Sequence, residues 1–353
     1  MKITLKQATT LVQTVGTTNT VLLRGQPGVG KSSILRTLEK RLPDYQMCYI
    51  DVANLDLGDL AMPVIDRENM TTSYAPNVRF GVGRNQHKPV CLMLDELGKA
   101  SRPVMNMLLP TILEHRIGDV SLPTGSIVFA TTNLDTDGVG DNIPAHAYNR
   151  MTVVPIANPT PEEWFEWASD NDVSPEVMAF VKQYPQVMDC YDDMEDGAKN
   201  PYIFNPLTGN IKAFCSPRSL AAASNLIKQR EVLGEALLPA LMGTIGEAAA
   251  RDMEALVNLS DSLPSFEAIV TNPTTTKIPD SVGALFIMSF MLAGRVNEDT
   301  LPAVMTYTDR MAQTHAEPHA LFILTLASNK SKVGMACRNR EFTKQAAALG
   351  KYL

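Results

Sequence analysis

The first part of the chain alternates short apolar runs with stretches of helical pattern. Each run is almost continuously apolar, which is typical of parallel strands in a sheet that helices cover on both faces. The runs lie at residues 20–25, 46–52, 89–96 and 125–133. This alternation predicts an α/β domain built on a parallel sheet, which we place at residues 1–157.

The pattern changes near residue 158, and no later segment repeats the buried-strand runs. Pro161, followed by Glu162 and Glu163, favours the start of a helix, because proline suits the first helical position and acidic side chains suit the first turn. We therefore expect a helical second half, with a lid domain at 158–250 and a helical C-terminal extension at 251–353. Further helical patterns lie at 216–233, 234–259, 279–293 and 301–313.

The most apolar helical segment is ALFIMSFMLAG at 284–294, and it is either a buried helix or a membrane or partner helix. A membrane span needs about 18–20 apolar residues, so a buried helix is favoured. The N-terminus has no apolar segment of the kind that signal peptides carry. We expect a cytoplasmic protein with no membrane span.

A glycine-rich stretch, GQPGVGKSS, lies between the first apolar run and a helical segment. It matches the pattern GxxxxGK[ST] in the strand-to-helix context that supports phosphate binding; the alternative is a tight turn without a ligand. The main-chain amides of such a loop hold phosphate oxygens, the lysine reaches the β and γ phosphates, and the serine hydroxyl reaches Mg²⁺. The sequence predicts ATP and Mg²⁺ as cofactors, bound by Gly25, Gln26, Pro27, Gly28, Val29, Gly30, Lys31, Ser32 and Ser33.

Asp95 and Glu96 end the third apolar run. Two carboxylates at the carboxyl end of a buried strand are costly unless a cation lies beside them, and Mg²⁺ at the phosphate loop is the evident candidate. We expect Asp95 to hold Mg²⁺ and Glu96 to act as the general base that activates water. An acidic pair that ends a strand is common by itself, and only its combination with the phosphate loop makes the prediction specific.

Three further residues are candidates for a role in ATP hydrolysis because of their positions in the sequence. Asn133 follows the fourth apolar run, where its amide either orients the attacking water or caps a turn, and position alone favours neither. Arg150 follows a short helical stretch, and Arg218 begins a helical segment in the second half. Each is either a surface arginine or a guanidinium that reaches a γ phosphate, including that of another subunit.

The phosphate loop, LMLDE, ATTN, Arg150 and SPRSL, taken in this order, resemble the AAA+ ATPases, and more narrowly their MoxR-like and dynein-related branch. The resemblance covers about residues 5–235. It includes ELGKASRPVMNMLLPTILEHRI after the acidic pair, and DGVGDNIPAHAYNRM, which resembles the segment of that branch that leads to its arginine finger. The chain departs from the branch at Gly98 and Lys99, where Asn and Arg are usual, and at Met151, where Phe usually follows the arginine.

The resemblance implies a P-loop NTPase fold of the AAA+ type with a helical lid, assembled as a homo-oligomeric ring. Such rings are commonly hexamers that bind ATP between subunits. By motif match, Asn133 would be sensor 1, Arg150 the arginine finger acting in trans, and Arg218 the sensor-2 arginine of the lid. The catalytic set is then Glu96, Asn133, Arg150 and Arg218, with Ser32 and Asp95 at the metal.

The resemblance also identifies two segments outside the nucleotide motifs. HRIGDVSLP at 115–123 is similar to the β-hairpin insert of this branch, and NLDLGDLAMP at 54–63 is similar to a segment that can face the ring's pore. His115 and Arg116 are alternatives to Arg150 as intersubunit contacts. Members of the branch often work with a partner that carries a von Willebrand factor A domain.

Composition bears on the choice between function classes. The formal net charge is −7, and no basic stretch is interleaved with aromatic residues, so a nucleic-acid groove is disfavoured. We expect an ATP-hydrolysing ring that remodels a protein partner. The alternative is a nucleic-acid-stimulated motor or helicase loader. A scaffolding ring that only binds ATP is disfavoured, because it has no need of Glu96 or Asn133.

Overall fold

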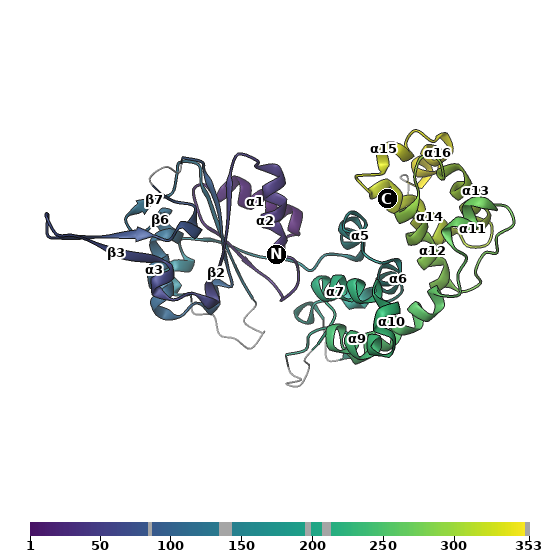
Figure 1. The fold of residues 1–353 in the computed structure, drawn as a ribbon, viewed down its shortest axis with the longest axis horizontal. Coiled ribbons are helices and arrows are strands. Elements are labelled where there is room, and N and C mark those ends of the chain that lie inside the picture. Colours follow the sequence, from purple (N-terminus) through teal and green to yellow (C-terminus); the bar gives the residue numbers. More distant parts are fainter. Residues whose placement is uncertain (84–86, 134–142, 195–198, 207–212, 350–353) are drawn as a thin grey trace. The chain divides into compact units, whose positions relative to one another are not determined.

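The computed structural model describes residues 1–83, 87–133, 143–194, 199–206 and 213–349. The chain divides into two compact units, Met1–Asn158 and Pro159–Leu353 (Figure 1). The first unit carries the sheet that the sequence predicts, and the second is helical.

The first unit is built on a five-stranded sheet in the order β2-β5-β8-β1-β9, in which every neighbouring pair is parallel. Its strands are β1 (Val21–Arg24), β2 (Gln46–Asp51), β5 (Val90–Asp95), β8 (Ile127–Thr132) and β9 (Thr152–Pro155). The first four correspond to the four predicted runs. The fifth, β9, is an edge strand that the sequence pattern did not predict. The fold is the P-loop α/β fold, as expected.

Helices cover both faces of this sheet, which explains why the strands are apolar throughout. On one face, Val21 and Leu23 pack in a buried cluster with residues of α1 (Leu5–Val15) and α2 (Ser33–Arg41). On the other face, Leu22 packs in a second cluster with residues of α3 (Arg102–Glu114) and α4 (Ala145–Tyr148). Successive residues of β5 and β8 thus point to opposite faces that are both buried.

Two antiparallel hairpins extend from the first unit (Figure 1). One joins β3 (Ala61–Asp66) to β4 (Thr71–Pro76), and the other joins β6 (Arg116–Ile117) to β7 (Val120–Ser121), where the sequence predicts an insert. Their backbones are linked, because Tyr74 N donates to Asp119 Oδ2 at 2.6 Å and Asp119 N donates to the Tyr74 carbonyl at 3.3 Å. Gly118, at φ 56°, permits this approach: a Cβ there would lie 2.6 Å from the Tyr74 carbonyl oxygen.

In the described residues of the second unit, the regular elements are helices. Its first helix begins as predicted, with Pro161 at the first position and a capping box in which Thr160 and Glu163 bond each other's backbone amides. The helices are α5 (Pro161–Asp170), α6 (Pro175–Gln183), α7 (Pro217–Ile227), α8 (Arg230–Leu233), α9 (Leu237–Ile245), α10 (Glu247–Ser260), α11 (Phe266–Thr271), α12 (Val282–Arg295), α13 (Leu301–Ala312), α14 (Ala316–Ser328), α15 (Val333–Ala336) and α16 (Arg340–Leu349).

Short 3₁₀ turns connect several of these elements. They are η1 (Val52–Asn54), η2 (Leu57–Asp59), η3 (Val78–Phe80), η4 (Leu97–Lys99), η6 (Pro185–Met188), η7 (Tyr191–Asp193) and η9 (Gly234–Ala236). Of these, η4 matters for the site below, because it directly follows the acidic pair.

Helix α12 contains the most apolar predicted segment, and it is a buried helix. Phe286 and Phe290 contribute to a cluster that begins at α5, whereas Met288 and Leu292 contribute to a cluster that extends to α16. Among the helices that the structure describes, none has the length and apolar character needed to cross a membrane. The predicted division of this half at 250/251 stays a prediction, and that boundary falls inside α10.

Candidate nucleotide-binding site

The glycine-rich loop connects β1 to α2 at the carboxyl edge of the sheet. Gly28 and Gly30 adopt φ values of 79° and 107°, a backbone region that other residues rarely enter. The Gly25 amide donates to the Thr132 carbonyl of β8 at 3.2 Å, which ties the loop to the neighbouring strand. The sequence therefore forms the turned, amide-rich loop that phosphate binding requires.

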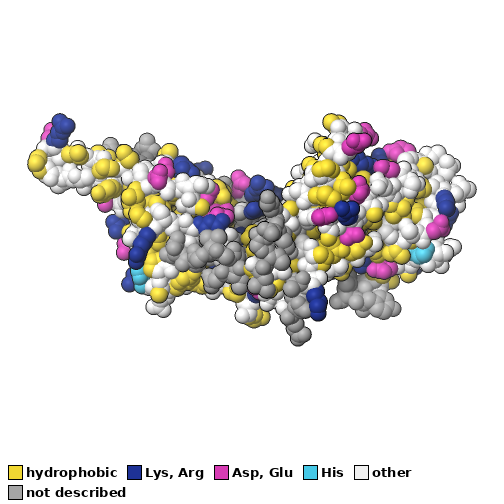
Figure 2. Space-filling model, turned by 90° about the horizontal axis from the view of Figure 1, so that it is seen from below, with side chains coloured by type: hydrophobic (Ala, Val, Ile, Leu, Met, Phe, Trp, Pro, Cys, Tyr) yellow, Lys and Arg dark blue, Asp and Glu magenta, His cyan; other side chains and the backbone are white. Residues whose placement is uncertain are grey.

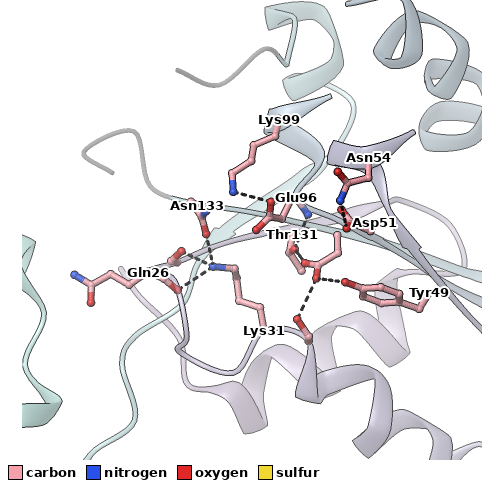
Figure 3. A network of polar contacts seen from close by, with 12 residues as sticks. Gln26, Lys31, Tyr49, Asp51, Asn54, Glu96, Lys99, Thr131 and Asn133 are labelled. Atoms are coloured by element: carbon pink, nitrogen blue, oxygen red, sulfur yellow. Dashed lines mark hydrogen bonds and ion pairs between the residues drawn. The ribbon is translucent and has the colours of Figure 1, made fainter. Parts of the chain in front are cut away.

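Lys31 is buried in this loop, and its ammonium group is held by three oxygens (Figure 3). Lys31 Nζ donates to the carbonyls of Gly25 at 2.5 Å and Gln26 at 2.9 Å, and to Asn133 Oδ1 at 3.0 Å. Asn133 thus lies beside the phosphate loop, as the sequence predicts from its place after β8. The carbonyls of the loop hold the ammonium group in place. A bound phosphate would be a stronger partner for it than these carbonyls, because the phosphate is negatively charged.

Asp95 is 8% exposed at the end of β5, and three hydroxyl groups donate to its carboxylate. Ser32 Oγ and Tyr49 OH donate to Oδ2 at 3.1 and 2.9 Å, and Thr131 Oγ1 donates to Oδ1. These hydrogen bonds compensate for the burial of the carboxylate. Ser32 and Asp95, which the sequence predicts as the metal site, are therefore in direct contact.

Glu96 follows Asp95 in a left-handed backbone conformation, at φ 54°. Such a conformation is strained for a residue with a Cβ and is found preferentially at functional sites. The Glu96 amide donates to Thr131 Oγ1 at 3.3 Å, and its carboxylate pairs with Lys99 Nζ of η4 at 2.6 Å. The two side chains are 39% and 34% exposed, so the ion pair is accessible to solvent and weak.

The structure brings five predicted residues together at one edge of the sheet. Lys31, Ser32, Asp95, Glu96 and Asn133 come from the ends of β1, β5 and β8, which are neighbours in the strand order. The remaining loop residues of the prediction, Gln26, Pro27, Val29 and Ser33, lie in the same turn or at the start of α2.

The two predicted arginines lie in different units of the chain. Arg150 is exposed just after α4 in the first unit. Arg218 is exposed in the first turn of α7 in the second unit. Of the alternatives to Arg150, Arg116 donates to the Gly118 carbonyl at 3.2 Å and pairs with Glu114 at 3.4 Å, and His115 ends α3 with burial lowering the pKa of its imidazole.

Sequence reasoning did not assign a role to Tyr49, Thr131 or Lys99. Thr131 lies two residues before Asn133 on β8, so its hydroxyl was the most detectable of the three. Lys99 was noted only as a departure from the family pattern. Tyr49 had no signal, because it belongs to no motif and its contact with Asp95 depends on the pairing of β2 with β5.

The donor set fits Mg²⁺ held together with a nucleotide. Within the part of the chain that the structure describes, no group of three or more His, Cys, Asp or Glu residues could hold a metal ion by itself. Magnesium sites in nucleotide enzymes instead use one or two protein oxygens and the phosphates. Ser32 Oγ directs its single proton to Asp95, which leaves both of its lone pairs for a cation.

Residues 20–172 match the family described as the AAA domain of the dynein-related subfamily. Together with the fold and the phosphate loop, this match shows that residues 20–172 form an AAA+ domain similar to that subfamily. A comparison with curated proteins found no match.

Solved structures give weak likenesses over much of the chain. The RuvB Holliday junction branch migration motor of Thermotoga maritima is 16% identical over 90% of this chain and 86% of its own, with a TM-score of 0.39. A putative ATPase from Cytophaga hutchinsonii is 15% identical over 70% and 82%, with a TM-score of 0.36. NtrX from Brucella abortus, in complex with ADP, is 15% identical over 99% and 66%, with a TM-score of 0.34. These values are too low to carry an argument about function.

Proposed function

We propose that the protein is a magnesium-dependent ATPase that acts as a homo-oligomeric ring and remodels a protein partner. The observation that carries the proposal is the placement at one edge of the sheet of two contacting pairs, Lys31 with Asn133 and Ser32 with Asp95, next to Glu96. It combines an anion-binding loop, an oxygen pair for a metal and an accessible carboxylate. These are the parts that phosphoryl transfer to water requires.

Each of these residues has a distinct role in this proposal. The loop amides and Lys31 bind the β and γ phosphates of ATP, and Ser32 and Asp95 hold Mg²⁺. The metal supplies positive charge that neutralises the phosphate oxygens. Glu96 accepts the proton of the attacking water, and Asn133, already beside Lys31, orients that water or senses the γ phosphate.

The exposed arginines complete the proposed machinery. Arg150 projects to solvent from the nucleotide-binding unit, which suits a finger that enters the site of the next subunit. Arg218 supplies the sensor-2 contact from the helical lid. We place the ring, hexameric as in the resembling family, in the cytoplasm, with a partner that carries a von Willebrand factor A domain as the leading candidate.

Lys99 is expected to restrain hydrolysis. Its ammonium occupies Glu96 Oε2 at 2.6 Å, an oxygen that would otherwise accept the proton from water. Replacing Lys99 with methionine should raise steady-state ATP turnover about two- to fivefold, in keeping with the small energy of an exposed ion pair. Lys99→Arg keeps the cation and is the matched control. An unchanged or lower rate in Lys99→Met, with normal ATP binding, would show that the pair does not restrain the base.

The hairpin β3–β4 supports a protein partner rather than a nucleic acid. Its strands expose apolar side chains on both faces: Met62 is 59% exposed, Val64 50%, Ile65 69% and Tyr74 46%. Apolar side chains are visible along the projecting hairpin in Figure 2. The stretch 61–76 carries two acidic residues and one arginine, which does not suit a phosphate backbone. Exposed apolar surface of this kind is typical of protein contacts.

Replacing Val64 and Ile65 together with threonine should remove stimulation by the partner and leave basal ATP turnover unchanged. Threonine keeps the β-branched shape that the strand favours but removes apolar surface from both faces of the hairpin. The measurement is ATPase activity of the tagged full chain, with and without a co-purifying protein, and separately with single-stranded or duplex DNA at moderate salt.

Val232→Thr is the control, because Val232 is 89% exposed on a helix of the other unit. Stimulation by DNA, unaffected by the hairpin changes, would instead favour a nucleic-acid motor. An absence of ATP turnover under every condition would contradict the proposal as a whole.

A further inference from the structure

The Asp95 carboxylate accepts hydrogen bonds from three hydroxyl groups. Ser32 and Thr131 both belong to the nucleotide motifs, but the third donor, Tyr49, comes from β2, at the edge of the sheet. We propose that Tyr49 is a positioning residue for magnesium, holding the Asp95 carboxylate in the orientation that binds the metal. This inference rests on the proposed ATPase function.

The register of the sheet explains how Tyr49 reaches Asp95. Tyr49 lies opposite Met93 on β5, and Asp51 lies opposite Asp95, so the phenol extends diagonally by two positions (Figure 3). Met93 belongs to the cluster on the face that α2 covers. Tyr49 therefore approaches Asp95 on the same side of the sheet as Ser32, which precedes α2.

The hydrogen bond from Tyr49 matters because the Asp95 carboxylate can accept only a limited number of hydrogen bonds. A carboxylate offers about four lone-pair positions, and three hydroxyls already donate to Asp95. Tyr49 and Ser32 both donate to Oδ2, which leaves the remaining position on Oδ1, beside Thr131. Without the phenol, the carboxylate would have two open positions and could rotate about its side-chain bond.

Tyr49 contributes to this site through its hydroxyl group, which donates to Asp95 Oδ2 at 2.9 Å. The side chain is 49% exposed, and its ring contributes little to the core. Packing therefore does not explain the tyrosine at position 49, whereas its hydrogen bond to Asp95 does.

The test is Tyr49→Phe in the full-length protein, because it removes one hydroxyl and keeps the ring. Mn²⁺ can serve as a paramagnetic substitute for Mg²⁺, and its binding in the presence of ADP can be titrated by electron paramagnetic resonance. We expect the affinity for Mn²⁺ to fall about tenfold, since a hydrogen bond to a charged group is lost. ADP affinity in excess chelator, without metal, should be unchanged.

Tyr45→Phe is the matched control, because the Tyr45 hydroxyl donates to the Gly125 carbonyl at 3.1 Å, away from Asp95. An unchanged Mn²⁺ affinity in Tyr49→Phe would overturn the inference. A loss of metal-free ADP binding would overturn it as well, by showing that Tyr49 supports the loop and not the metal. If the unsubstituted protein binds neither ADP nor Mn²⁺, the proposed function itself fails. Equal melting temperatures establish that the variants are folded.

Discussion

Replacing Glu96 with glutamine is expected to lower ATP turnover about 10²- to 10³-fold while ATP binding stays intact, because a positioned general base contributes a factor of this order. The glutamine amide keeps the size of the side chain but cannot accept the proton of water. The phosphate loop and the contact of Ser32 with Asp95 do not involve this side chain. The variant should hold ATP for long periods, which single-turnover kinetics and retention of labelled ATP on a sizing column can measure.

Glu114→Gln provides the control for this substitution. Glu114 is also a partly exposed carboxylate in an ion pair, with Arg116 at 3.4 Å, but it lies at the end of α3. Its replacement should leave turnover unchanged. Hydrolysis at the normal rate in Glu96→Gln would remove Glu96 from the role of base, and the carboxylate responsible would have to be sought elsewhere.

The apolar pattern predicted four strands of the central sheet but neither the edge strand β9 nor the hairpin β3–β4. Runs such as VCLMLDE become β5 because each side chain, in or out, meets a helical layer. Strand β9 is partly exposed along its whole length at the sheet edge, so its four residues carry no such run. The hairpin β3–β4 is exposed on both faces, and a strand without a buried face has no alternation to detect.

The candidate site was predictable where it depends on short motifs and not where it depends on strand order. Lys31 with Ser32, and Asp95 with Glu96, are each local patterns whose chemistry is evident. Their contacts require β5 and β8 to lie beside β1, which the topology supplies. Tyr49 reaches Asp95 only because β2 pairs with β5 in one particular register, and no sequence pattern specifies that register.

Arg150→Ala is expected to lower ATP turnover about 10³-fold or more without loss of ATP binding, because an arginine finger has an effect of this size on phosphoryl transfer. Arg150 is exposed and belongs to no contact of the Lys31–Asn133 cluster in its own chain, so its removal leaves the phosphate loop unaltered. Arg41→Ala, at the exposed end of α2, is the control. Loss of ATP binding in Arg150→Ala would instead place this arginine in the site of its own subunit.

Mixing the two inactive variants distinguishes action in trans from action in cis. In a ring assembled from equal amounts of Glu96→Gln and Arg150→Ala chains, roughly one interface in four combines an intact Glu96 with an intact Arg150 from the neighbour, since head-to-tail contacts join unlike surfaces. Turnover should therefore return to about a quarter of the unsubstituted rate, if the interfaces act independently. Two different affinity tags can verify that the chains share one ring. Mixed rings that stay inactive would contradict an arginine donated between subunits, because each such ring contains both intact groups on adjacent chains.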